Sequence, residues 1–257
     1  MRPNKVKALW RAGKPALVGW MSIADTYAAE VLANTGLDAL VLDTQHGMGI
    51  GPDRAAAWLQ AVSSTETVPI VRVPWNEPAY VQWVLDAGAY GVIIPLVGTR
   101  EEAAKAAGAC RYAPLGYRSV GPNRARYYAG ADYLQRANEE IICLVMIEDI
   151  KAVDRLDQIA SVPGIDGLYI GPWDLAMTMG VDPTTYAKNE AHAAACAKVL
   201  EAAKRHKLVP GTHVNSPEEA LHRFKQGFLF SPITTDTGSL GKGAASALNL
   251  VRSGLGR

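Results

Sequence analysis

Two short apolar runs of the sequence each lead to a carboxylate. Ile142–Ile147 is followed directly by Glu148, and Leu168–Ile170 is followed by Gly-Pro-Trp and then by Asp174. Short apolar runs of this kind are typical of buried strands. Carboxylates are scarce in such surroundings unless they are paired or bind a metal. The pattern therefore predicts that two strands each deliver one carboxylate to a divalent metal site.

Three more residues of chemical interest lie in or just beyond other apolar runs. Asp43 and His46 follow Ala39–Leu42, and His46 is the best candidate for a general base. A structural histidine bonded to a backbone carbonyl is the alternative. Arg72 is the one charge in Val68–Val73. Its planar guanidinium suits a carboxylate, a phosphate or a developing enolate oxygen, and a buried salt bridge to Asp43 or Glu148 is compatible with that role.

Other polar residues allow two interpretations. Asp86 comes near the end of a helical pattern, where it either faces solvent or reaches the mouth of the fold. His213 ends another apolar run, where it either lines the site or packs against the core. The three cysteines have neither a disulfide framework nor a zinc-binding spacing, so we interpret them as packing thiols.

The elements that must position these residues alternate regularly. Apolar strand candidates occur at Ala16–Met21, Ala39–Leu42, Val68–Val73, Gly91–Val97, Ile142–Glu148, Gly167–Gly171, Leu208–Val214 and Phe228–Ile233. Amphipathic helical patterns lie between them, at Tyr27–Asn34, Arg54–Val62, Ala79–Leu85, Glu101–Cys110, Val153–Ile159, Ala187–Arg205 and Pro217–Lys225. Eight strand–helix repeats without a linker predict one α/β domain over residues 1–257, a (β/α)8 TIM barrel.

One long segment fits neither kind of element. Ala113–Asn138 is rich in glycine and proline and carries Arg118, Arg124 and Arg126. Long loops in compact domains are usually functional or mobile. Because this segment comes after the fourth strand candidate, we expect it to cover the carboxyl-end face, where the active sites of such barrels are built.

Composition excludes several classes of function. The net charge is +1, and basic residues are not interleaved with aromatic ones, so the sequence gives no indication of nucleic-acid binding. No apolar run is long enough to cross a membrane, and the N-terminus lacks a secretory leader pattern. We therefore expect a cytoplasmic protein that acts on small molecules.

Taken together, the motifs resemble the HpcH/HpaI aldolase family. The resemblance rests on Asp43-Thr-Gln-His-Gly47, Val71-Arg-Val-Pro74, Arg111-Tyr112 with Tyr117-Arg-Ser-Val-Gly121, Ile147-Glu148 and Ile170-Gly-Pro-Trp-Asp-Leu175, and it extends over nearly the whole chain. The members are metal-dependent class II pyruvate aldolases on a TIM barrel. The resemblance implies a lyase that interconverts a 4-hydroxy-2-oxo acid with pyruvate and an aldehyde.

The resemblance also implies roles for individual residues. Glu148 and Asp174 would bind Mg²⁺, Mn²⁺ or Co²⁺, and Arg72 would contact the keto or enolate oxygen. His46 would act as the base through a water molecule, in a dyad with Asp86. The substrate-binding residues would be Arg72, Gly171, Pro172, Trp173 and Asp174, and further candidates are Asp43, Gln45, Arg118, Arg124, His213 and Val214.

Some positions depart from the family pattern. Gln45 stands where many members have Glu, Met146 where many have Gln, and Trp173 where a small or polar residue is more common. The Asp-x-Gln-His-Gly form is shared with members described as hydroxy-ketoacid aldolases. This feature raises hydroxypyruvate as a second donor.

Other functions remain as alternatives. A Schiff-base aldolase requires a lysine in the barrel interior, and no apolar strand run contains one. A citrate-lyase-like enzyme acting on a CoA thioester would need a basic entrance, which Arg118, Arg124 and Arg126 could supply. A non-catalytic barrel would keep the fold and bind no metal.

The resemblance finally implies an oligomer. Family members are commonly hexamers, trimers of domain-swapped dimers in which the last helix packs on a neighbour. Ala244–Val251 could be that helix. In such an assembly, Ala113–Asn138 and Asp43 could contribute to a site shared between subunits.

Overall fold

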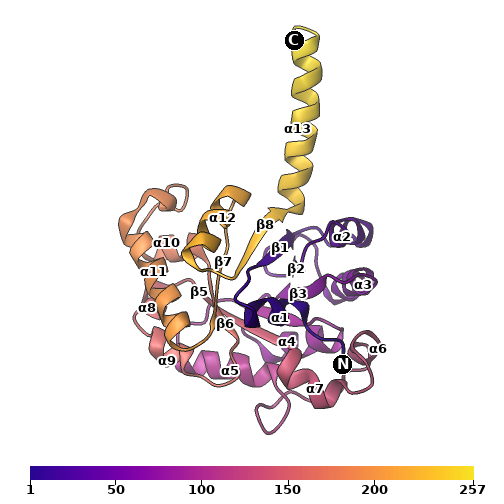
Figure 1. Ribbon diagram of the computed structural model, residues 1–257, viewed down its shortest axis with the longest axis vertical. Coiled ribbons are helices and arrows are strands. Elements are labelled where there is room, and N and C mark those ends of the chain that lie inside the picture. The colour runs from indigo at the N-terminus through magenta and orange to yellow at the C-terminus, as the bar shows by residue number, and fades with distance from the viewer.

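Eight parallel strands form a closed barrel in which strands adjacent in the sequence are also adjacent in space (Figure 1). The computed structural model describes residues 1–257. The strands are β1 (Ala16–Met21), β2 (Ala39–Asp43), β3 (Val68–Arg72), β4 (Gly91–Ile94), β5 (Ile142–Ile147), β6 (Gly167–Ile170), β7 (Val209–Thr212) and β8 (Phe230–Thr235). Each of the eight predicted strands overlaps one of these, and the predicted TIM barrel is confirmed.

Helices surround the barrel and close its amino end. They are α1 (Lys5–Arg11), α2 (Thr26–Ala33), α3 (Pro52–Val62), α4 (Pro78–Asp86), α5 (Arg100–Cys110), α6 (Ala125–Ala129), α7 (Tyr133–Glu140), α8 (Ile150–Val153), α9 (Leu156–Ala160), α10 (Pro172–Thr178), the 3₁₀ helix η1 (Tyr186–Lys188), α11 (Glu190–Arg205), α12 (Pro217–Gln226) and α13 (Asp236–Gly254). The predicted helix Val153–Ile159 is divided in two by a turn at Asp154 and Arg155. The predicted helix Ala187–Arg205 is interrupted at Asn189, whose side chain caps α11.

The strands are apolar because both of their faces are covered, as parallel sheets require. All residues of β2 and β5 are buried. The register pairs Asp43 with Arg72 across β2 and β3, and Ile147 with Ile170 across β5 and β6. Residues that follow these strands therefore lie at one level, at the carboxyl end of the barrel.

Glycines end several helices before the next strand begins. Gly88 follows α4 with φ 110°, and Gly227 follows α12 with φ 107°. This left-handed conformation suits glycine because it has no Cβ. The chain can thus reverse within a few residues and enter the next strand.

The predicted position of Ala113–Asn138 is wrong. This segment contains α6 and α7 and follows α5, so it joins a helix to a strand and lies at the amino end of the barrel. Arg111 donates a hydrogen bond to the carbonyl of Ile141, which precedes β5, at 2.8 Å. The Asn138 side chain binds the backbone of Tyr112 through two hydrogen bonds. Figure 1 shows α6 and α7 at the end of the molecule away from α13.

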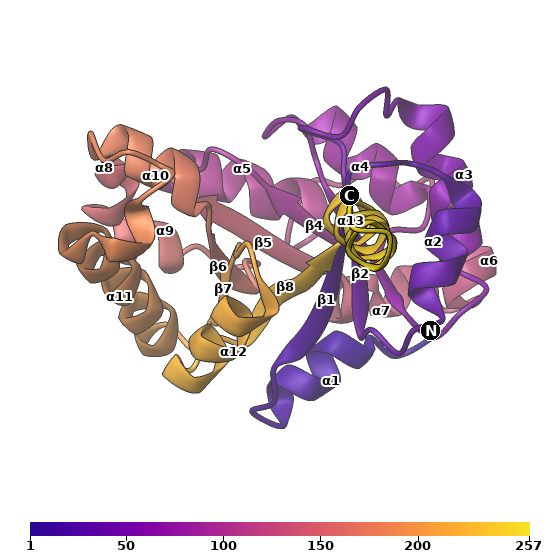
Figure 2. The ribbon, with the colours of Figure 1, turned by 90° about the horizontal axis from the view of Figure 1, so that it is seen from above.

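The last helix stands clear of the barrel. α13 begins where β8 ends and projects away from the other elements, as Figure 1 shows from the side and Figure 2 from above. Every residue from 239 onward is exposed. The predicted helix Ala244–Val251 is the middle of this longer one. No helix of the chain combines the length and the apolar character needed to cross a membrane.

Candidate active site

The carboxyl ends of the strands surround a cavity of about 450 Å³. Its lining residues come from the ends of seven of the eight strands, all but β4, and from the segments that follow them: Trp20, Ser22, Asp43, His46, Arg72, Met146, Glu148, Gly171, Pro172, Trp173, Asp174, Met177, Pro183, His213, Asn215, Thr235 and Thr237. This is the face on which TIM barrels carry their active sites. The cavity therefore contains most of the predicted site residues.

Asp43 holds Arg72 in a fixed orientation. The Arg72 guanidinium forms a two-point ion pair with the Asp43 carboxylate, with Nε 2.9 Å from Oδ1 and Nη2 bonded to Oδ2. Trp20 Nε1 donates to the same carboxylate at 3.3 Å, and the guanidinium lies over the Trp20 ring. Burial alone would raise the pKa of Asp43, but the bonds and charge of Arg72 hold it below its usual range. The predicted salt bridge is thus formed with Asp43.

Glu148 is a buried carboxylate that forms no ion pair with a lysine or arginine side chain. It follows β5 and is 3% exposed. Oε1 accepts a hydrogen bond of 2.6 Å from the backbone N–H of Leu96, which has an unusual positive φ of 56°. Burial, together with repulsion from Asp174, raises the pKa of Glu148 to about 7. A nearby divalent cation would favour the charged form and reverse this shift.

Asp174 lies in the first turn of α10, opposite Glu148 in the cavity. The turn before it starts at Gly171, whose backbone N–H bonds the carbonyl of Ile147 at 3.3 Å. A Cβ on Gly171 would clash with Glu148 Oε2, so only glycine allows β6 to pass so close to the carboxylate. Pro172 occupies the first helical position and Trp173 is half-exposed at the rim.

The two carboxylates fit a hard divalent cation. Mg²⁺ and Mn²⁺ prefer oxygen ligands and are often held by one or two carboxylates together with substrate and water. No group of three or more His, Cys, Asp or Glu side chains that could hold a metal gathers anywhere in the chain. A metal at Glu148 and Asp174 would therefore take its remaining ligands from substrate and water.

His46 is exposed in the cavity and its ring makes no hydrogen bond within the chain. Its backbone N–H bonds Asp43 Oδ1 at 3.1 Å, which anchors the turn after β2. Gln45 precedes it, and the buried Oε1 of Gln45 has no partner. The imidazole is therefore free to meet a substrate or a water molecule.

The predicted partner of His46 is absent from this cavity. Asp86 ends α4 at the amino end of the barrel, where its carboxylate bonds Arg118 at 2.6 Å. Because α4 runs antiparallel to the strands, its last residue and the residues after β2 lie at opposite ends. A His46–Asp86 dyad within one chain is therefore excluded by the fold.

Four other candidates, Gln45, Arg118, Arg124 and Val214, are also not among the residues that line the cavity. Arg118 is buried, with Tyr133 and Tyr112 as further partners, and Arg124 bonds Ala87 and Ser63. Both arginines fasten the α6–α7 segment to the amino end of the barrel. Val214 is buried and lines a smaller neighbouring cavity.

His213 lines the cavity and also packs against barrel side chains, so both of its interpretations describe its position, and a role in the site stays a prediction. It follows β7 and is half-buried. Its Nδ1 lies 3.2 Å from the hydroxyl of Tyr169, and its ring meets Trp20 edge-on with centroids 4.6 Å apart.

The sequence analysis missed several lining residues. Trp20 is the last residue but one of β1, close to the strand end, so the strand-end rule that selected Asp43 could have pointed to it as well. Thr235 and Thr237 lie at the start of α13, where Asp236 accepts hydrogen bonds from the backbone of Ser22. These residues meet only because β8 pairs with β1, which no local pattern reveals.

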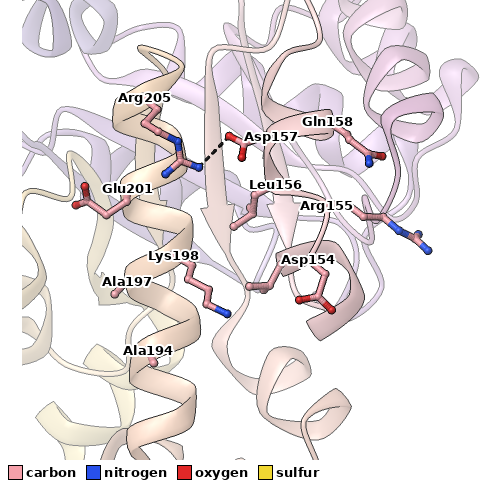
Figure 3. A pocket seen from close by; sticks show the side chains of 11 residues that line it. Asp154, Arg155, Leu156, Asp157, Gln158, Ala194, Ala197, Lys198, Glu201 and Arg205 are labelled. Atoms are coloured by element: carbon pink, nitrogen blue, oxygen red, sulfur yellow. Dashed lines mark hydrogen bonds and ion pairs between the residues drawn. The ribbon is translucent and has the colours of Figure 1, made fainter.

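A larger groove, about 740 Å³ in volume, lies between the α8–α9 segment and α11 (Figure 3). It is lined by charged surface side chains, among them Arg205 and Asp157, which form an ion pair of 2.8 Å. No strand end reaches it. This groove lies on the outer helical layer, so it is separate from the cavity at the carboxyl ends of the strands.

Comparisons with known proteins identify similar chains. The chain is 38% identical over 245 residues to a hydroxypyruvate/pyruvate aldolase of Rhizorhabdus wittichii, covering 95% of this chain and 97% of that one. It is 36% identical over 251 residues to a 4-hydroxy-2-oxo-heptane-1,7-dioate aldolase of Shigella flexneri, covering 95% and 91%.

Solved structures show the same likeness. A HpcH/HpaI aldolase/citrate lyase family protein from Burkholderia cenocepacia superimposes with a TM-score of 0.89 and 32% identity, covering 97% of this chain and 99% of that one. A family model described as HpcH/HpaI aldolase/citrate lyase matches residues 17–242. The chain therefore belongs to the HpcH/HpaI aldolase/citrate lyase family.

Proposed function

We propose that this protein is a divalent-metal-dependent aldolase, a carbon–carbon lyase of the class II pyruvate type. It interconverts a 4-hydroxy-2-oxo acid with an aldehyde and pyruvate or hydroxypyruvate. The observation that carries the proposal is that Glu148 and Asp174 line one cavity together with Arg72 and His46. The aldolase names of the relatives support it.

Glu148 and Asp174 are the residues that would hold Mg²⁺, Mn²⁺ or Co²⁺. When bound, such an ion supplies Lewis-acid stabilisation of negative charge at the 2-oxo group. Two properties of Glu148 support this assignment. Its carboxylate is buried with a raised pKa, and no lysine or arginine side chain pairs with it.

Arg72 stabilises the charge that develops on the keto oxygen when C3 loses a proton. Its guanidinium is always charged, and Asp43 fixes its orientation before substrate arrives. Backbone N–H groups around Trp173 and Asp174 would bind the substrate carboxylate. The carboxylate and the adjacent keto oxygen of the 2-oxo acid are then held while C3 remains free to react.

His46 moves the proton. In the aldol direction it takes a proton from C3, through a water molecule, and C3 then attacks the aldehyde carbon. His46, again through water, returns this proton to the resulting alkoxide to give the 4-hydroxyl group, and the reverse sequence cleaves the C3–C4 bond. Because Asp86 lies at the other end of the barrel, an Asp86 that orients His46 would have to come from a second copy of the chain.

Deuterium exchange at the pyruvate methyl group tests this proposal directly. Proton NMR follows the exchange in chelator-treated protein and in protein resupplied with Mg²⁺, Mn²⁺ or Co²⁺. We expect exchange only with metal, and its loss in Glu148→Ala and Asp174→Ala. The matched control Asp53→Asn changes an exposed carboxylate on α3 and should exchange like the wild type. Absence of exchange at C3 of both pyruvate and hydroxypyruvate with every metal would contradict the proposal.

The thioester alternative loses its main support. The basic entrance expected for a CoA nucleotide rested on Arg118, Arg124 and Arg126. The first two bond partners at the amino end of the barrel, and Arg126 lies in α6 on the same segment. The cavity therefore favours a small 2-oxo acid over a CoA thioester.

We also propose that α13 packs against a second copy of the chain, within a hexamer of swapped dimers. Leu240, Leu248, Val251 and Leu255 are exposed on one side of this helix, at intervals of three, four and eight residues. An apolar stripe that contacts nothing in its own chain is suited to pairing with another copy.

A further inference from the structure

His213 has one ring nitrogen committed to the protein and one that is not. Nδ1 is bonded to the hydroxyl of Tyr169, at 3.2 Å. Nε2 has no hydrogen-bond partner in the chain. It is not fully buried, so it is accessible from the cavity that His213 lines. A histidine that only packed against the barrel would not keep a nitrogen open to the substrate space.

The surroundings decide where the imidazole proton lies. Burial raises the pKa of Tyr169, so this residue keeps its phenolic proton. His213 Nδ1 is its only hydrogen-bond partner, so the hydroxyl donates and Nδ1 accepts. Burial and the charge of Arg72 also lower the pKa of His213 to about 4, so the ring is neutral near pH 7. Its single N–H proton is then on Nε2, which makes Nε2 a hydrogen-bond donor towards the cavity.

The position of this donor follows from the walls of the cavity. Arg72 lies on one side of the Trp20 ring, 4.9 Å from its centroid, and His213 meets the same ring at 4.6 Å. With the substrate carboxylate near the start of α10 and the keto oxygen at Arg72, C3 faces the remaining wall. His46, Trp20 and His213 are among the lining residues not used by the carboxylate or the keto oxygen.

We propose that His213 determines donor specificity, by donating a hydrogen bond from Nε2 to the C3 hydroxyl of a hydroxypyruvate-type 2-oxo acid. The inference rests on the proposed aldolase function and adds the residue that selects the donor. Pyruvate has no oxygen at C3, so it leaves this donor unpaired. A half-buried donor that loses its partner costs binding energy, and discrimination based on a hydroxyl group is correspondingly strong.

The test compares two donors in one enzyme. The kcat/KM values for hydroxypyruvate and for pyruvate are measured with Mg²⁺ and formaldehyde, the smallest aldehyde, as the common acceptor. In His213→Leu the ratio of the two values should fall about tenfold or more, the worth of one hydrogen bond to a partly buried group. His213→Gln retains an N–H donor and should recover part of the ratio.

Two further variants separate specificity from folding. Tyr169→Phe removes the hydroxyl that fixes the tautomer, so the ratio should fall in the same direction but by less than in His213→Leu. His206→Leu is the matched control, because His206 lies at the end of α11 and bonds Asp157 on the surface. Its ratio should equal that of the wild type.

The results that would overturn the inference differ from those that would overturn the function. A wild type that uses only pyruvate, or a His213→Leu variant with the wild-type ratio, contradicts the role of His213 and leaves the aldolase intact. A wild type inactive on both donors with every metal contradicts the aldolase itself.

Discussion

Glu148 has opposite effects on stability and on function. Its carboxylate is well placed for a metal ion, but without one it is a buried acid that faces Asp174. Its pKa of about 7 in the folded chain exceeds the value of about 4.3 expected in the unfolded chain. The folded metal-free protein therefore holds a proton that the unfolded chain releases between these two values.

This difference predicts how stability depends on pH. The folded pKa is raised, so the contribution of Glu148 is fully present below about pH 4.3 and is lost as pH rises through 7. In metal-free wild-type protein, the stability should fall by about 2.5 kcal/mol between pH 5 and 7.5 because of this group, and Glu148→Gln should remove that fall. Urea unfolding in the presence of a chelator measures it at several pH values. Equal slopes for the two proteins would show that Glu148 does not titrate as described.

Asp43 gives a second prediction at the scale of single residues. Asp43→Asn removes the negative charge that pairs with Arg72 and leaves a half-buried guanidinium unpaired. Breaking such a pair costs about 3 kcal/mol of unfolding free energy. We expect that loss in denaturant titrations, together with slower exchange of the pyruvate methyl group because Arg72 is no longer oriented. Wild-type exchange in this variant would show that Arg72 needs no anchor.

At the scale of elements, the strands were predictable and one connection was not. Apolar runs ending in Asp43, Glu148 and Gly171 gave both the barrel and most of the cavity, because buried parallel strands must be apolar and their ends must meet. The α6–α7 segment was misplaced because it was counted from β4, although α5 had already returned the chain to the amino end. The chain runs towards the carboxyl end of the barrel along each strand and back to the amino end along each helix. Missing one helix in the count therefore places the next segment at the wrong end of the barrel.

The candidate site was likewise predictable only in part from the sequence. Asp86 was assigned to His46 by resemblance alone, and the fold of one chain separates them. Trp20 and Thr235 were not found because they reach the cavity through the closure of β1 on β8, a contact between the two ends of the sequence. Local patterns identify strand ends but not which of them become neighbours when the barrel closes.

The junction between β6 and α10 gives a prediction at this scale. Gly171→Ala adds a Cβ against the carboxylate of Glu148, which must move or push α10 away. We expect binding of Mn²⁺ to weaken and methyl exchange to fall by about a hundredfold, comparable to losing a charged transition-state contact. Isothermal titration with Mn²⁺ checks the first effect. Gly241→Ala is the control, because a Cβ there meets nothing within 4 Å.

At the scale of the whole molecule, α13 predicts assembly. The double variant Leu248→Lys and Val251→Lys places two charges on the apolar stripe defined above, and desolvating them against a second copy is unfavourable. Analytical ultracentrifugation should then show a smaller species than the wild type at the same concentration. Ser253→Lys, another exposed position on α13, should leave the mass unchanged. A monomeric wild type at micromolar concentration would contradict the proposed oligomer.

The isolation of α13 also has a thermodynamic consequence. A helix of 19 residues with glycines at 238, 241 and 243 receives no stabilisation from packing along most of its length. Single helices of this kind are marginal in water, and each interior glycine lowers helix stability by about 1 kcal/mol relative to alanine. We therefore expect the exposed part of α13, from residue 239 onward, to be in a helix–coil equilibrium that association would shift towards helix. Far-ultraviolet circular dichroism should consequently lose helical signal on dilution while the barrel stays folded, so the secondary structure content of this protein depends on its concentration.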